Sequence, residues 1–172
     1  PGQIERQVTY PLETALAGRH PHLGRWDWES AADAAKVREA LSLLGLAGME
    51  QRQVHTLSGG ERQRLALATL LVQAPGVYLL DEPLSHLDLN HQMAVLRLFS
   101  QLAHTQGAAV VMVLHEPALA HRFCDRALLI HGDGRCIQGT ADETLTAAQL
   151  SELYAYRLRQ ISDGDQRCFI PE

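Results

Sequence analysis

The chain is poor in cysteine and in long apolar runs, and each shortage argues against a class of protein. Its three cysteines, Cys124, Cys136 and Cys168, are odd in number and have no CxxC spacing, so the sequence predicts neither a disulfide framework nor a zinc knuckle. The longest apolar run, 108–114, has seven residues, whereas a membrane-spanning helix needs roughly 20. We therefore expect a protein of a reducing compartment and find no candidate for a spanning helix.

Lysine is also scarce. Of the 15 basic residues only Lys36 is a lysine, and it follows Ala35 in an Ala-rich, helical pattern. A phosphate-cradling P-loop needs Gly-Lys followed by Ser or Thr, because the glycines let backbone N–H groups reach the phosphate and the lysine neutralises it. These 172 residues therefore contain no P-loop.

The charge balance argues against nucleic acid as a partner. Fifteen Lys and Arg against 20 Asp and Glu give a net charge of −5, the wrong sign for a surface that attracts a phosphate backbone. A hydrophobic content of 46% is ordinary for one globular domain with a core. The first residues, PGQIERQVTY, lack an initiator Met and the basic and apolar sequence of a signal peptide, so we interpret the start as an internal cut.

The first third of the chain predicts helices and loops without a strand. The pattern indicates a short helix over 11–17, a loop over 19–22 and a longer helix over 29–44 that ends near Gly45. Farther on, Ser58 and Glu61 have the spacing of a capping box, which predicts a buried helix that continues to Val72.

The middle of the chain predicts a strand, a helix and a second strand. The apolar runs 77–80 and 109–114 are typical of strands that are covered on both faces, and Asp88 is placed to cap the helix between them. In a parallel sheet of this kind, side chains that carry chemistry gather at the carboxyl ends of the strands. Asp81 and Glu82 follow the first strand, and His115 follows the second.

The last third predicts two hairpins and two helices. Gly132-Asp133-Gly134 separates two short strands over 127–130 and 135–138, and Asp163-Gly164 separates 159–161 from 166–170. A short helix is expected near 118–123. Thr146 and Gln149 have capping-box spacing at the start of a helix that reaches Tyr156.

Four motifs in this order resemble the ATP-binding subunits of ABC transporters. They are Leu57-Ser58-Gly59-Gly60-Glu61-Arg62-Gln63-Arg64, Leu79-Leu80-Asp81-Glu82-Pro83, Ser85-His86-Leu87-Asp88, and His115 after a strand. By the resemblance they are the signature, Walker B, the D-loop and the H-loop. The implied fold is α/β, an incomplete P-loop NTPase with a mostly parallel sheet flanked by helices, an α-helical subdomain over 1–56, and a core with C-terminal hairpins over 57–172.

The resemblance also implies what precedes these motifs. Walker A and the aromatic adenine-stacking loop would precede Pro1, and the Q-loop glutamine would lie at or just before it. Gln3 follows Pro1-Gly2 rather than a strand, so we do not assign it to the Q-loop. We expect the 172 residues alone to bind ATP weakly or not at all.

The signature is predicted to bind the nucleotide. Ser58, Gly59 and Gly60 place a hydroxyl and two amides without side chains at a helix N-terminus, where N–H groups and the helix dipole attract a phosphate oxyanion. In the family this turn closes on the γ-phosphate held by the other subunit of a head-to-tail dimer. The resemblance adds Glu61 and the D-loop Asp88 to the nucleotide-binding residues, with ATP and Mg²⁺ as cofactors.

Three residues are predicted to carry the hydrolysis. Asp81 is a hard carboxylate that can hold Mg²⁺ through its water shell, and Glu82 is the catalytic base by the resemblance. Adjacent side chains of an extended chain point in opposite directions, so one carboxylate can serve the metal while the other faces the attacking water. His115 is predicted to orient the γ-phosphate and the water.

Other conspicuous residues are assigned no chemistry. His20-Pro21-His22 supplies two histidines, fewer than a zinc site needs, and a surface loop is the preferred interpretation. In the family the region that contains Trp26 and Trp28 faces the membrane subunit, so a partner groove and core packing are equally plausible for these two residues.

Within the family, the segment 17–22 and the tail 139–156 resemble importers of iron-siderophore, haem or cobalamin type. The resemblance implies a cytoplasmic ATPase, peripheral on the inner face of the cell membrane, that pairs with a second copy, docks on an integral-membrane permease and depends indirectly on a substrate-binding protein. Two alternatives stay open: a non-catalytic remnant that supplies only its signature face, and a DNA-maintenance ATPase. The second lacks support, because no heptad arm precedes Ser58, no cysteine-rich insertion is present and the charge is negative.

Overall fold

The computed structural model describes residues 9–24, 28–164 and 166–172. Gln3 and Trp26 lie outside these residues. The chain forms two compact units, Pro1–Val111 and Met112–Glu172, and each is described by itself. The sequence predicts a different division, between a helical subdomain over 1–56 and a core over 57–172, and this division stays a prediction.

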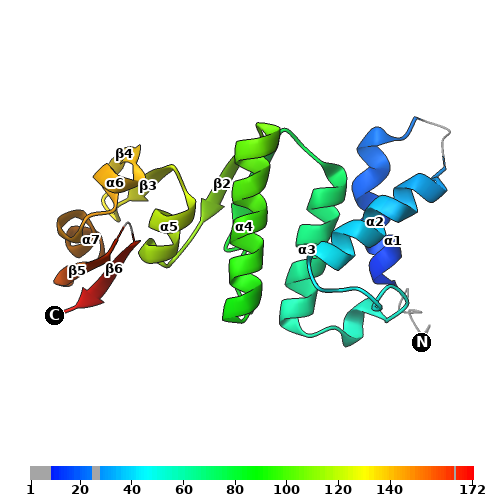
Figure 1. The fold of residues 1–172 in the computed structure, drawn as a ribbon, viewed down its shortest axis with the longest axis horizontal. Coiled ribbons are helices and arrows are strands. Elements are labelled where there is room, and N and C mark those ends of the chain that lie inside the picture. Colours follow the sequence, from blue (N-terminus) through cyan, green and yellow to red (C-terminus); the bar gives the residue numbers. More distant parts are fainter. Residues whose placement is uncertain (1–8, 25–27, 165) are drawn as a thin grey trace, which may run out of the picture. The chain divides into compact units, whose positions relative to one another are not determined.

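The first unit begins with helices gathered around one long helix. In chain order they are α1 (Pro11–Leu16), the 3₁₀ helix η1 (Ala17–His22), α2 (Ala31–Leu43), the 3₁₀ helix η2 (Val54–Thr56) and α3 (Gly59–Gln73). α1, η1 and α2 all pack against α3 (Figure 1). Their buried apolar side chains include Val37, Leu41, Leu65 and Ala68, so the amphipathic pattern of the sequence builds this layer.

The segment expected to be a loop is instead η1, and its contacts with α3 explain why it is ordered. A Cβ atom on Gly18 would lie 2.4 Å from the carbonyl oxygen of Thr69, so only glycine allows this approach. Arg19 Nη1 donates to the carbonyl of Val72 (3.3 Å), and His22 Nε2 lies 2.7 Å from the carbonyl oxygen of Gln73. These contacts satisfy carbonyls at the end of α3 that have no partner within the helix.

The two histidines of His20-Pro21-His22 contact other groups of the chain. His22 binds a backbone carbonyl, and His20 faces Glu29 at 3.7 Å. Within residues 9–24, 28–164 and 166–172, no group of three or more His, Cys, Asp and Glu side chains is placed to hold a metal ion.

The strand, helix and strand that follow are β1 (Val77–Asp81), α4 (Leu89–Gln106) and β2 (Ala109–Val113), and β1 pairs with β2. The expectation that β1 is covered on both faces is wrong. Its burial alternates: Tyr78 and Leu80 are buried, and Tyr78 meets Phe99 of α4 edge to face, whereas Val77 and Leu79 are exposed. α4 covers one face, and in the described part of the chain nothing covers the other.

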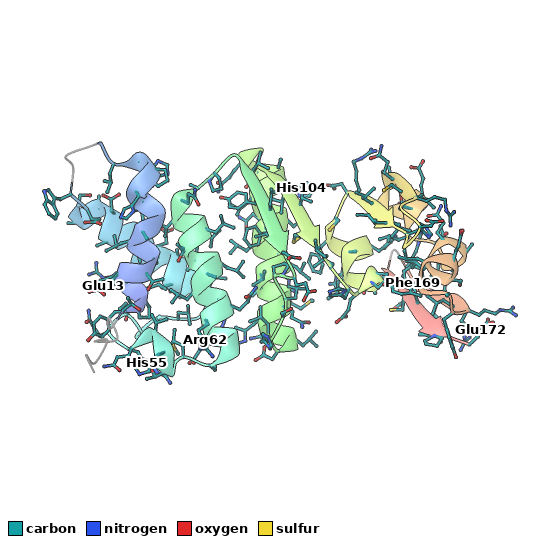
Figure 2. All side chains as sticks on the ribbon, turned by 180° about the vertical axis from the view of Figure 1, so that it is seen from behind. Glu13, His55, Arg62, His104, Phe169 and Glu172 are labelled. Carbon is teal, nitrogen blue, oxygen red and sulfur yellow. The ribbon has the colours of Figure 1, made fainter. Side chains whose placement is uncertain are left out.

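The second unit is built from the two predicted hairpins. β3 (Arg126–Ile130) pairs antiparallel with β4 (Cys136–Thr140), and β5 (Leu158–Asp163) pairs antiparallel with β6 (Gln166–Pro171). α5 (Pro117–Phe123) packs against β6, α6 (Ala141–Thr144) against the first hairpin, and α7 (Ala147–Tyr154) against β5. Leu129, Ala141, Leu145 and Leu150 form the core, with Phe169, labelled in Figure 2, packed against it.

The predicted capping box of α7 forms only in part. Thr146 accepts a hydrogen bond from the amide of Gln149 (3.3 Å), as expected. The Gln149 side-chain oxygen is buried and has no hydrogen-bond partner within the described residues, so the reciprocal half of the motif is missing.

In the part of the chain that the structure describes, no helix is long and apolar enough to span a bilayer.

A buried ion pair in the first unit predicts a pH-dependent stability. Asp33 accepts from Arg19 Nε at 2.8 Å and from the Ser30 hydroxyl at 2.7 Å. The bonds from Ser30 and then the Arg19 guanidinium lower the pKa of Asp33 to about 2. Because the folded-state pKa is depressed, this group stabilises the fold above its ordinary pKa, and the stabilisation is lost as the pH falls toward 2.

We therefore expect Asp33→Asn to lower the free energy of unfolding at neutral pH. Urea unfolding of both proteins across pH checks this: the difference between them should shrink as the pH falls from about 4 to about 2. A difference that stays constant over that range would contradict the role of the charge.

Candidate functional site

The signature turn is a complete capping box at the start of α3. The hydroxyl of Ser58 accepts from the amide of Glu61 (3.2 Å), and the Glu61 carboxylate accepts from the amide of Ser58 (2.6 Å). The other carboxylate oxygen of Glu61 accepts from Arg52 Nη1 at 3.2 Å. The prediction that Ser58 caps this helix is confirmed.

This capping leaves a specific pair of donors at the turn. The first amides of an α-helix have no carbonyl partner within the helix, and among the described hydrogen bonds the Ser58 hydroxyl takes the amide of Glu61. The amides of Gly59 and Gly60 are therefore the ones placed to meet a ligand. They stand at the positive end of a helix of 15 residues, which favours an anion.

The Glu61 carboxylate is bonded to Ser58, the N-cap of its own helix, and to Arg52. Backbone and side-chain hydrogen bonds from Ser58 lower the pKa of Glu61, so the group is ionised at neutral pH. The prediction that Glu61 binds the nucleotide stays a prediction. What the geometry shows is a carboxylate that fixes the backbone of Ser58.

The loop after β1 contains two non-glycine residues with positive φ. Glu82 has φ +45° and His86 has φ +64°, a conformation that ordinary side chains adopt rarely and that clusters at functional sites. The Ser85 amide donates to the Glu82 carbonyl (3.1 Å), and the Ser85 hydroxyl donates to the Glu82 carboxylate (3.1 Å). The side chain predicted to be the catalytic base is thus oriented by the serine three residues later.

The signature turn packs directly on this loop. A Cβ atom on Gly60 would lie 2.7 Å from the carbonyl oxygen of His86, whereas one on Gly59 would lie 3.5 Å from the His86 ring. The Gln63 amide also donates to the Glu82 carbonyl, at 3.5 Å. Two segments that the sequence assigns to different motifs are therefore in van der Waals contact.

An open pocket of about 400 Å³ lies where the two segments meet. It is lined by residues of the signature turn, of α3, of the loop before α4 and of the first turn of α4: Ser58, Gly59, Gly60, Glu61, Arg64, His86, Leu87, Asp88 and His91. All five residues predicted from the sequence to bind the nucleotide line this pocket. Its glycine amides and the imidazoles beside them suit a phosphate group.

Asp88 both lines the pocket and caps α4, as the sequence predicted. It accepts from the backbone amide of His91 (2.9 Å) and lies 2.8 Å from Nδ1 of the same residue. These two hydrogen bonds lower the pKa of Asp88. The carboxylate is therefore held as an anion at the beginning of α4, where the helix dipole favours it.

Asp81 is the last residue of β1, and its side chain is exposed. A single hard carboxylate of this kind suits Mg²⁺, which keeps most of its ligands as water and phosphate oxygens rather than as a protein cage. The residues present therefore fit Mg²⁺ when phosphates supply the other ligands.

His115 lies in the second unit, two residues beyond the end of β2, and Glu116-Pro117 begins α5 directly after it. The predicted position at a strand end is confirmed. Its role beside Asp81 and Glu82 stays a prediction, as do the catalytic and metal-binding roles of those two residues. Trp28 is almost fully exposed, which leaves a surface role open to it.

Three pocket residues, Arg64, His86 and His91, carry polar groups for which no role was predicted from the sequence. A signal for Arg64 was present: it shares a helix face with Ala68, four residues later, and that face is buried. An arginine on the core face of a helix predicts buried acceptors. No such signal was present for His86, because its placement depends on a positive φ that cannot be deduced from the sequence.

Comparisons with known proteins show what the chain is similar to. The family model described as "ABC transporter" matches residues 4–85. The cobalamin import ATP-binding protein BtuD of Halobacterium salinarum is 46% identical over 118 residues, which are 69% of this chain and 29% of the relative. The ferric enterobactin transport ATP-binding protein FepC of Escherichia coli is 34% identical over 166 residues, 95% of this chain and 58% of the relative. The chain thus spans well under two thirds of these relatives.

Solved structures show the same likeness. A putative metal-chelate type ABC transporter in an inward-facing conformation is 27% identical, with a TM-score of 0.84 over 99% of this chain and 69% of that one. A dimeric bacterial ABC transporter cassette is 26% identical, with a TM-score of 0.63 over 73% of this chain and 55% of that one. The chain is therefore similar to part of the ATP-binding cassette of ABC transporters, and it has the fold that the motifs predicted.

The close approach of Gly60 to the loop predicts unequal effects of two neighbouring substitutions. Gly60→Ala forces a methyl group against a backbone carbonyl and should lower the free energy of unfolding by about 1–3 kcal/mol. Gly59→Ala meets only a side chain at ordinary contact distance and should change it little. Urea unfolding of the two variants checks this, and equal effects would contradict the packing described here.

Proposed function

We propose that the protein is the ATP-hydrolysing subunit of an import system for a metal chelate of the iron-siderophore, haem or cobalamin kind. The observation that carries the proposal is the single pocket in which the signature turn, with two glycine amides at a helix N-terminus, meets Asp88 and its loop. The names of the relatives, which are ATP-binding proteins of cobalamin import and of ferric enterobactin transport, support transport over DNA maintenance.

In this proposal the signature turn binds the terminal phosphate of an ATP held by a second copy of the chain. The amides of Gly59 and Gly60 and the dipole of α3 stabilise negative charge there. The dimeric cassette among the structural neighbours supports a two-copy assembly. Because these 172 residues contain no P-loop, we infer that they do not hydrolyse ATP by themselves.

Glu82 is the proposed general base. The Ser85 hydroxyl donates to its carboxylate, which orients the side chain for abstraction of a proton from an attacking water. Asp81 holds Mg²⁺, which when bound neutralises charge on the phosphates. His115 orients the water and the γ-phosphate as a donor. Each of these roles extends the resemblance to residues whose local placement the structure describes.

The proposed partners follow from the same assignment. A permease in the membrane receives the region from Tyr10 to Trp28, in which Trp28 is exposed, and a substrate-binding protein delivers the chelate to the permease. The protein acts at the cytoplasmic face of the membrane. Uptake by cells therefore depends on ATP hydrolysis at this subunit.

Glu82→Gln tests the proposal in the natural gene product together with its permease. We expect kcat for ATP hydrolysis to fall about a hundredfold or more, as loss of a general base requires, and uptake of the chelate to stop. The matched control is Glu39→Gln, which changes an exposed glutamate of α2 and should leave both activities unchanged. Undiminished uptake with Glu82→Gln would remove the assigned role of Glu82.

A further inference from the structure

Arg64 is a buried cation in the first unit. Only 9% of the residue is exposed. Its Nη1 donates to the carbonyls of Leu44 (2.9 Å) and Gly45 (3.0 Å), and its Nε donates to the carbonyl of Gly60 (3.4 Å). A guanidinium out of water must bind acceptors, and here all three acceptors are backbone carbonyls of two different segments.

The two segments are the end of α2 and the beginning of α3. Leu44 caps the C-terminus of α2, and Gly45 follows with φ +67°. The last carbonyls of a helix lack intrahelical partners and carry the negative end of its dipole, so a cation stabilises them. Gly60 belongs to the signature turn. One side chain therefore ties the C-terminus of α2 to the turn that carries the amides proposed to bind phosphate.

The same junction reaches the loop of Asp88. A Cβ atom on Gly45 would lie 2.9 Å from Arg64 Nη1 and 3.5 Å from His91 Nε2. His91 in turn bonds to Asp88. The end of α2, the signature turn and the beginning of α4 thus meet within a few ångströms, with Arg64 bonded to two of the three.

We infer that Arg64 is a positioning residue for the phosphate-binding turn. Arg64 fixes the carbonyl of Gly60 against the end of α2, and this contact sets the direction of the neighbouring amides. The inference rests on the proposed function, because it concerns the same pocket. Arg64 acts through Gly60 and not by taking part in the chemistry.

The test compares three variants of the natural gene product. Arg64→Met keeps the length of the side chain without its donors, and Arg64→Lys keeps the charge without the planar fork. Arg62→Met is the matched control, because Arg62 is exposed on the first turn of the same helix (Figure 2). For each variant we would measure kcat for ATP hydrolysis and the Kd of the single subunit for a non-hydrolysable ATP analogue.

We expect Arg64→Met to lower kcat about tenfold or more and to leave the Kd within about twofold. In the proposed function the analogue is held by a P-loop, and the signature turn meets the nucleotide only in the closed dimer. Arg64→Lys should recover part of kcat, and Arg62→Met should match the unmodified protein. If Arg64→Met does not fold, Arg64→Lys shows the same split with a smaller loss of kcat.

Three results would overturn the inference. The first is a folded Arg64→Met protein whose kcat equals that of Arg62→Met. The second is a loss of analogue binding in parallel with kcat, which indicates a general structural role. The third is an unmodified protein that hydrolyses no ATP with its permease, which removes the proposed function and the inference with it. The first two leave the proposed function intact, so the failures are distinguishable.

Discussion

The site depends on the close packing of a glycine against a backbone carbonyl. Gly60, in the first turn of α3, approaches the carbonyl of His86 so closely that a side chain of any size would collide with it. That approach places the N-terminus of a long helix beside the loop that follows β1. Without it, the amides of the signature turn and the carboxylate of Asp88 would not share a pocket.

The charges around the pocket are arranged so that the acidic groups bind their own chain. Glu61 is held by Ser58 and Arg52, and Asp88 is held by His91, so both anions serve as helix caps. Arg64 is bonded to carbonyls. The groups that remain for a ligand are the positive end of α3 and its glycine amides. These groups suit a phosphate, because they repel an anion little.

Much of the fold follows from local sequence signals. The capping pair Ser58 and Glu61 specifies the start of α3, Asp88 specifies the start of α4, and the glycine turns specify both hairpins. Each of these predictions is confirmed. The failures have a common cause. η1 is ordered by contacts with the far end of α3, and β1 is exposed on one face because burial depends on neighbours in space. Neither can be deduced from a local window of sequence.

The candidate site, like the fold, follows in part from local sequence signals and in part from contacts between distant segments. The motifs predicted which residues gather in the pocket, since their spacing is fixed by the family, but not how the turn is held. The positive φ of His86 and the reach of Arg64 to Leu44 arise from segments that are distant in the chain. Tertiary contacts of this kind fix the geometry of a site after local signals have chosen its residues.

In the proposed function the signature turn closes on a nucleotide carried by a second copy. The solution mass of the Glu82→Gln natural gene product, measured by light scattering with and without Mg-ATP, tests this closure most directly. We expect the mass to double with Mg-ATP and not with Mg-ADP, and we expect a further Ser58→Arg substitution to abolish the doubling. A mass that does not change with Mg-ATP, or that doubles equally with Ser58→Arg, would contradict the closure.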